Sequence, residues 1–153
     1  MIIHLATDHA GFYHKEAVAS WLKEAGFDVQ DHGAVEYDEL DDFTDFISKA
    51  AEAVNDDPNS KAVIFGGSGQ GEAMLANSYP MVRAVVYYGG DEIIPVLSRQ
   101  HNDSNILSIG ARFVDVDLTK KLIWDWLHAE ALSDEKYQRR NKKIAEITKS
   151  LHS

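Results

Sequence analysis

The stretch KAVIFGGSGQGEAMLAN, residues 61–77, joins an apolar run, a glycine-rich loop and a helix-like segment. The apolar run at 61–65 is typical of a buried strand, and the loop that follows holds four glycines within six residues. A strand, a tight loop and a helix in this order form the repeating unit of a parallel sheet. The stretch therefore predicts an α/β fold, with the loop at the carboxyl end of a central strand.

The same alternation continues on both sides of this unit. We expect strands at residues 2–6, 27–33, 61–65, 82–88 and 104–110, and helices at residues 11–25, 42–54, 71–79, 91–101, 115–127 and 134–151. Gly26 should end the first helix, Asp42 should cap the second, and Asp115 or Asp117 should cap the fifth. The pattern predicts one α/β domain over residues 1–153, with a five-stranded, mostly parallel sheet and helices on both faces.

Composition describes an ordinary globular chain. Of its 153 residues, 44% are hydrophobic and 26% are charged, and no apolar run approaches the ~20 residues that cross a bilayer. The N-terminal residues lack the basic and apolar regions of a secretory signal, so the cytoplasm is the expected compartment. The absence of cysteine excludes disulfides, thiolate chemistry and cysteine-ligated zinc.

Charge and histidine spacing narrow the possible partners. A formal net charge of −10 argues against nonspecific binding to a nucleic-acid backbone. The seven histidines show no H-x-x-x-H spacing, so we expect no metal site. A small anionic ligand is compatible with this charge, because a few cations can converge locally.

Polar clusters fall where strands are expected to end. They are TDHAG at residues 7–11, GGSGQGE at 66–72 and GAR at 110–112, while SRQHNDSN at 98–105 should approach from a helix end. Ligands of open α/β sheets bind beyond the carboxyl ends of the strands. We therefore expect all four clusters to converge on one side of the sheet.

The glycine loop matches neither common nucleotide motif. It lacks the lysine of a P-loop, and Glu72 stands where a dinucleotide fingerprint needs its third glycine. The remaining interpretations are a turn that needs glycine's backbone freedom, or a set of N–H donors for an anion or a developing oxyanion.

The side chains near the loop are open to two interpretations. Glu72 is either a partner of the helix dipole or a general base, and the hydroxyl of Ser68 could donate or shuttle a proton. Asp8 and His9 are either packing residues or ligand contacts. In the C-terminal segment, Lys136 and Arg140 share a helix face that is either solvated or, with Arg112, a phosphate clamp.

The order of motifs TDHAGF, DDFTDF, GGSGQGEAMLAN, VRAVV, SRQHNDSNIL and IGARF, followed by a basic helix, resembles the ribose-5-phosphate isomerase B family. That family includes the galactose-6-phosphate isomerase subunits, and the resemblance covers about residues 2 to 147. It implies a Rossmann-like three-layer α/β/α fold and isomerisation of a sugar phosphate through an enediolate, without metal or cofactor. It also implies a homodimer or a dimer of dimers, whose active sites are shared and whose C-terminal helix extends to the partner.

The resemblance also implies roles for individual residues. Many members carry a catalytic cysteine at the position of Gly66, whereas a branch with a GGSGQGE-like loop uses the following glutamate, here Glu72. The implied catalytic group is Glu72 as base, Ser68, and His101 for ring opening with Asp8 as its partner. The implied substrate contacts are His9, Gly67, Gly69, Gln70, Gly71, Asn102, Arg112, Lys136 and Arg140. In such a dimer, His101, Asn102 and Arg112 should reach a pocket built mainly by the other subunit.

Two departures from the family pattern bear on the substrate. Lys136 stands where arginine is usual and lacks its bidentate fork, and the connection at residues 87–95 is longer than usual. The expected reaction interconverts ribose 5-phosphate and ribulose 5-phosphate. The alternatives are the same reaction on galactose 6-phosphate or allose 6-phosphate, and a non-catalytic sugar-phosphate-binding protein.

Overall fold

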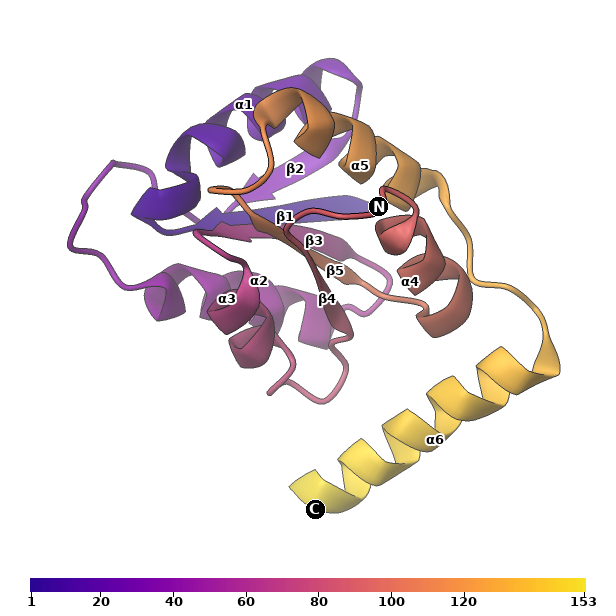
Figure 1. The fold of residues 1–153 in the computed structure, drawn as a ribbon. Coiled ribbons are helices and arrows are strands. Elements are labelled where there is room, and N and C mark those ends of the chain that lie inside the picture. The colour runs from indigo at the N-terminus through magenta and orange to yellow at the C-terminus, as the bar shows by residue number, and fades with distance from the viewer.

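A five-stranded sheet forms the centre of the computed structural model, which describes residues 1–153 (Figure 1). The strands are β1 (Ile2–Thr7), β2 (Asp28–Asp31), β3 (Lys61–Gly66), β4 (Ala84–Tyr87) and β5 (Ile106–Gly110). Their order is β2-β1-β3-β5-β4, and every neighbouring pair is parallel. The prediction of five strands is confirmed, and the sheet is wholly rather than mostly parallel.

Helices cover both faces of the sheet, as predicted. They are α1 (Phe12–Glu24), which follows the short 3₁₀ turn η1 (His9–Gly11), α2 (Phe43–Asp56), α3 (Gln70–Ala76), α4 (Ile94–Asn102), α5 (Val116–His128) and α6 (Glu135–His152). One core lies between the sheet and the α1–α5 pair, and a second lies between the sheet and α2 with α3. Strands buried on both faces have near-continuous apolar sequences, which is why β3 was recognisable. No helix combines the length and apolar character needed to cross a membrane.

Local signals explain several helix ends. Gly26 follows α1 with a φ of 93°, a conformation that glycine adopts without strain. Of the two candidate caps for α5, the structure selects Asp115, whose side chain accepts from the backbone N–H of Leu118. Asp42 occupies the N-cap position of α2, but its side chain makes no capping hydrogen bond, so that part of the prediction was wrong.

Two helices differ from their predicted ranges by three residues at one end. α3 ends at Ala76 rather than residue 79, because the side chain of Asn77 instead bonds the backbone N and O of Ala84 at the start of β4. α4 starts at Ile94 rather than residue 91, because the Asp91 side chain accepts from the N–H of Ile93 in a preceding turn.

Lys15 joins α1 to the end of β2 through a buried ion pair. Its side chain is fully buried, and its Nζ lies 2.6 Å from Asp31 Oδ2 and 2.7 Å from Glu16 Oε1. The other oxygen of Asp31 accepts from the N–H of Gly33 at 2.8 Å. Asp31 thus holds both the ammonium group and the turn that follows β2.

Removing Asp31 should therefore destabilise the fold. We expect Asp31→Ala to lower the free energy of unfolding by about 3 kcal/mol, because it leaves a buried ammonium group without its closest partner. Urea denaturation of this variant and of Asp28→Ala, an exposed position on the same strand, gives the measurement and its control. Equal losses in the two variants would show that the pair with Lys15 contributes nothing.

Candidate active site

Three of the predicted clusters meet at the carboxyl edge of the sheet. The register pairs Thr7 with Phe65, and Gly66 with Gly110, so the segments after β1, β3 and β5 lie side by side. Asp8 and Glu72 are buried there, with 8% and 5% of their surface exposed. The predicted convergence is confirmed for these three segments.

A positive φ and a close approach to the end of β5 explain one glycine of the loop, Gly69. Gly69 has a φ of 79°, and a Cβ there would lie 3.0 Å from Ser108 Oγ, which donates to the carbonyl of Gly69. The carbonyls of Gly66 and Gly67 accept from the N–H groups of Ala111 and Arg112. The loop is thus fastened to the segment that follows β5, while the side chains of Ser68 and Gln70 remain exposed.

Glu72 folds back over the end of β3. A Cβ placed on Gly66 would lie 1.8 Å from Glu72 Oε1 and 2.5 Å from Oε2, so the carboxylate occupies the space of a side chain at position 66. Burial raises the pKa of Glu72, a hydrogen bond to its own backbone opposes that shift, and the charge of Asp8 adds to it. A buried carboxyl group with a raised pKa is suited to accept and return a proton.

Two basic side chains lie at the same edge. The Nδ1 of His9 is 2.7 Å from Asp41 Oδ1, and this hydrogen bond is the main reason that the pKa of His9 is raised. The guanidinium of Arg112 lies against Gly67 of its own chain, where a Cβ would be 3.0 Å from its Cζ. The expectation that Arg112 serves the other subunit is therefore wrong, because the turn after β5 returns it to its own loop.

Asp41 is a site residue that sequence reasoning missed. It stands in the DDFTDF segment, which carried only the family resemblance, and nothing in its local pattern indicates a contact with His9, 32 residues earlier. Asp8, His9 and Asp41 also offer three ligand atoms within 4.8 Å of one another. A metal ion would need the neutral imidazole of His9, and the hydrogen bond to Asp41 raises the pKa of that ring.

The fourth cluster lies at the opposite edge of the sheet. His101 and Asn102 end α4, and the next three residues lead directly into the amino end of β5. β5 spans five residues, so roughly 13 Å of strand separates the two edges. The expectation that the fourth cluster joins the other three on one side of the sheet is therefore wrong. A helix between parallel strands runs antiparallel to them, and α4 consequently ends where β5 begins.

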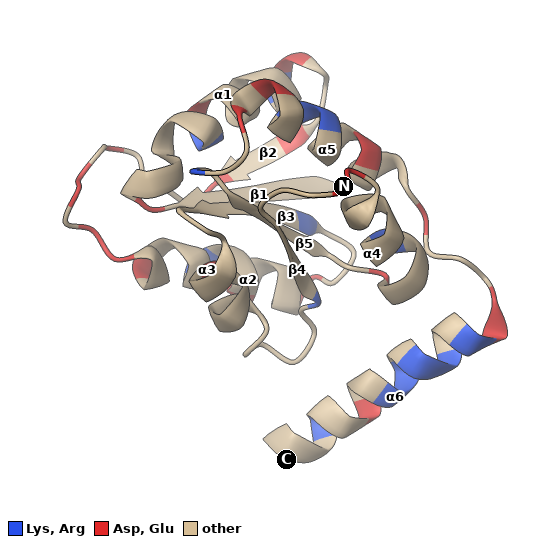
Figure 2. Cartoon of the chain, viewed as in Figure 1, with Lys and Arg blue, Asp and Glu red and all other residues tan.

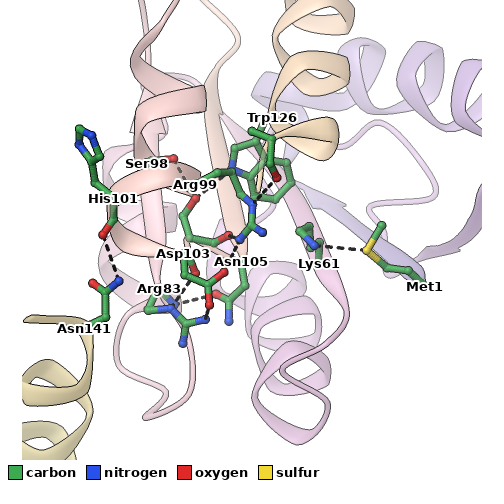
Figure 3. Close-up of polar contacts among 12 residues, drawn as sticks. Met1, Lys61, Arg83, Ser98, Arg99, His101, Asp103, Asn105, Trp126 and Asn141 are labelled. Atoms are coloured by element: carbon green, nitrogen blue, oxygen red, sulfur yellow. Dashed lines mark hydrogen bonds and ion pairs between the residues drawn. The ribbon is translucent and has the colours of Figure 1, made fainter. Parts of the chain in front are cut away.

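A partly buried polar network holds the turn after His101 (Figure 3). Arg99 Nη1 donates to Asp103 Oδ1 at 2.7 Å and to the carbonyl of Ser104 at 2.6 Å. From the start of β4, Arg83 Nε donates to the carbonyl of Asp103 at 2.7 Å. Asp103 has a φ of 49°, so this network maintains a backbone conformation that non-glycine residues rarely adopt.

The basic helix α6 joins this second cluster. Its Asn141 donates to the carbonyl of His101 at 3.0 Å, and the ring of His101 stacks on Tyr137 with centroids 4.4 Å apart. Beyond these contacts α6 projects from the body, buries no residue and carries a run of basic side chains (Figures 1 and 2). Lys136 and Arg140 are exposed on α6, away from Arg112. These three residues therefore do not form a phosphate clamp within one chain.

The candidate residues thus form two separate groups. At the carboxyl edge lie Asp8, His9, Gly67, Ser68, Gly69, Gln70, Gly71, Glu72 and Arg112; at the amino edge and on α6 lie His101, Asn102, Lys136 and Arg140. Both cavities of the chain lie beside α6, and neither is lined by Asp8, Ser68 or Glu72. The carboxyl-edge group therefore has no enclosed pocket within one chain.

The contact between Gly66 and Glu72 can be tested by a double-mutant cycle. We expect Gly66→Ala to lower the free energy of unfolding by about 1–3 kcal/mol, because its methyl group displaces the carboxylate. The same substitution in a Glu72→Ala background should cost less than about 0.5 kcal/mol, because the space is then open. Additive losses, measured by urea denaturation, would contradict the contact.

Comparisons with known proteins agree over nearly the whole chain. Residues 3–144 match the model of the family described as Ribose/Galactose Isomerase. The chain is 31% identical over 150 residues to ribose-5-phosphate isomerase B of Mycobacterium tuberculosis, covering 98% of this chain and 91% of the relative. It is 34% identical over 128 residues to the Escherichia coli enzyme of the same name, covering 84% of each.

Two solved structures share the fold. The crystal structure of ribose-5-phosphate isomerase B from Mycoplasma genitalium with bound ribulose-5-phosphate has a TM-score of 0.91 at 32% identity, covering 97% of this chain and 96% of that one. The enzyme from Clostridium thermocellum also has a TM-score of 0.91, at 36% identity and 99% coverage of both chains. This chain therefore belongs to the ribose/galactose isomerase family.

Proposed function

We propose that this protein is an aldose–ketose isomerase that interconverts ribose 5-phosphate and ribulose 5-phosphate, with Glu72 as the base. One observation carries the assignment of the base. The carboxylate of Glu72 occupies the space of a side chain at Gly66, and the family resemblance implies that many members carry a catalytic cysteine at this position. The glutamate thus stands where the cysteine would stand, and the two residues exclude each other sterically.

The reaction transfers one proton between neighbouring carbons. Glu72 removes the proton from C2 of the open-chain aldose, the electrons form the enediolate, and the proton returns to C1 as the carbonyl forms at C2. Backbone N–H groups of residues 67–71 stabilise the charge on oxygen, an effect of about 3–4 kcal/mol per donor in comparable sites. Ser68 moves protons between the oxygens, and His101, assisted by Asp8, opens the sugar ring. These steps use acid–base groups only, so no cofactor is proposed.

The phosphate is bound by cations from both groups of residues. His9 and Arg112 lie at the carboxyl edge, and we assign Arg140 and Lys136 on α6 to the same phosphate from a second subunit. Charge-assisted hydrogen bonds at this remote end position the sugar without taking part in the chemistry. Asn102 of the second subunit binds the sugar hydroxyls.

A homodimer, alone or as a dimer of dimers, brings the two groups together. In one chain His101 and Glu72 lie at opposite edges of the sheet, and α6 exposes an apolar stripe of Ile144, Ile147 and Leu151, which are 49%, 63% and 78% exposed. A second copy that covers this stripe buries it and can carry His101 to the partner's Glu72. We place this enzyme in the cytoplasm, in keeping with a chain that has no cysteine.

The nearest alternative is the same reaction on a six-carbon substrate. The description of the matching family names galactose as well as ribose, and by the resemblance Lys136 and the connection at residues 87–95 depart from the family pattern. A panel of ribose 5-phosphate, allose 6-phosphate and galactose 6-phosphate, compared by kcat/KM, tests the proposal. We expect ribose 5-phosphate to rank first; another order assigns a different substrate, and no turnover of any sugar supports a binding protein.

Replacing the base should separate catalysis from stability. We expect Glu72→Gln to lower kcat by about 10²–10⁴-fold while the affinity for phosphate is retained. Burial raises the pKa of the folded-state carboxyl, so its destabilising effect develops as pH rises from the unfolded-state pKa of about 4 to that raised pKa and is complete above it. In urea denaturation the variant should thus be more stable than the wild type at pH 8, with a difference that shrinks as pH falls through the raised pKa and is gone below about pH 4. Near-normal turnover would remove Glu72 as the base.

Mixing two inactive variants tests whether the site is shared. Glu72→Gln and His101→Ala should each be inactive, but a mixed dimer pairs an intact Glu72 with an intact His101 at one of its two sites. Co-expression of differently tagged chains should therefore recover up to about one quarter of wild-type activity, as expected for statistical pairing in a two-fold dimer. A mixture as inactive as its components would mean that each chain holds a complete site.

A further inference from the structure

The connection between β2 and α2 contains several acidic residues. Asp41 is the one whose side chain points into the protein. Most of this connection is exposed and strongly acidic (Figure 2). The side chain of Asp41, in contrast, is only 9% exposed. Its Oδ1 accepts two hydrogen bonds from one residue, from the backbone N–H of His9 at 3.0 Å and from His9 Nδ1 at 2.7 Å. Its Oδ2 is buried without a hydrogen-bond partner.

His9 pairs with Asp41 and not with Asp8, its neighbour in the sequence. Asp8 Oδ2 lies 3.9 Å from His9 Nδ1, too far for a hydrogen bond, and Asp8 Oδ1 accepts from the N–H of Ala10. A buried carboxylate with one unpaired oxygen depends on a nearby positive charge. The imidazole of His9 is the group in direct contact that can supply it.

All charged groups that face His9 come from three segments. Asp41, before α2, raises the pKa of His9 through its hydrogen bond and its charge, and Asp8, after β1, raises it further. Burial and the positive charge of Arg112, after β5, oppose the shift. The net direction is upward, which favours a protonated ring beside Arg112.

Aromatic contacts also hold the ring of His9 in one orientation. Tyr37 meets it edge to face with centroids 6.4 Å apart, and Tyr37 itself stacks on Tyr13 at 5.9 Å. With Nδ1 engaged by Asp41, Nε2 is the one ring nitrogen left to donate, and the side chain of His9 is 25% exposed. A ligand can therefore reach a fixed donor.

We propose that Asp41 is a positioning residue that holds the imidazole of His9 through Nδ1, favours its charged form, and directs its Nε2–H to the phosphate of the substrate. The inference rests on the proposed function only for the identity of the anion. The hydrogen bond itself exists without ligand, so it can be measured separately from turnover.

Asp41→Asn is the sharpest variant, because its amide oxygen can still accept both hydrogen bonds while the negative charge is lost. Asp45→Asn removes an exposed carboxylate from the first turn of α2 and is the matched control. NMR titration of the histidine Cε1–H signals, with His9→Asn to assign the resonance, should show a lower midpoint for His9 in Asp41→Asn than in the wild type or the control. Equal midpoints would overturn the proposal.

The second measurement concerns binding. Near pH 7, about one unit above the second pKa of a phosphate ester, most of the sugar phosphate already carries two charges, so changes in affinity report on the protein. There, Asp41→Asn should raise KM for ribose 5-phosphate about tenfold, the loss of one charge-assisted hydrogen bond, and change kcat by less than about twofold. An unchanged KM, or a loss confined to kcat, would refute the role in binding.

Failure of the proposed function would be visible as a different result. If the wild type isomerises no sugar phosphate, the dissociation constant of inorganic phosphate replaces KM, and about a tenfold weakening in Asp41→Asn still supports the assignment. If the enzyme is active but Asp41→Asn changes neither the titration midpoint of His9 nor KM, the role of Asp41 is refuted and the isomerase function stands.

Discussion

A parallel strand begins at one edge of its sheet and ends at the other, and this constraint governs where every functional group of this protein can lie. Each crossover helix returns the chain to the amino edge, so residues after strands gather at one edge and residues that end helices gather at the opposite one. Glu72 and Arg112 belong to the first set, and His101 to the second. One chain thus presents two incomplete groups, and the proposed dimer unites them by placing the edges of two copies against each other.

Within the carboxyl-edge group, the arrangement depends on the absence of a side chain at Gly66. The carboxylate of Glu72 occupies that space almost out of contact with water, with the like charge of Asp8 nearby. Burial of an acidic group in such surroundings is unfavourable for folding at neutral pH, but it produces a group that exchanges protons readily. Destabilising arrangements of this kind are tolerated at functional sites because they perform the chemistry.

The net charge of the chain conceals a local arrangement of opposite sign. Although the whole protein is acidic, Arg112 presents positive charge at the site beside His9, whose pKa is raised, and six of the 15 Lys and Arg residues lie on α6 (Figure 2). Asp41 belongs to the acidic excess, yet it raises the pKa of His9 and so favours positive charge where an anion would bind. The sign of the charge at a site depends on which charged groups are buried next to one another and not on the net charge of the whole chain.

The sequence by itself determined the elements and their order, because apolar periodicity and glycine or aspartate signals act over a few neighbouring residues. It also placed Glu72 and Ser68 beside a donor-rich loop, and its motif order matched a family. Only the tertiary structure decided that Glu72 folds over Gly66, that Arg112 returns to its own chain, that Asp41 holds His9, and that His101 lies at the far edge. Each of these depends on how distant segments meet in space, and no local pattern encodes that distance.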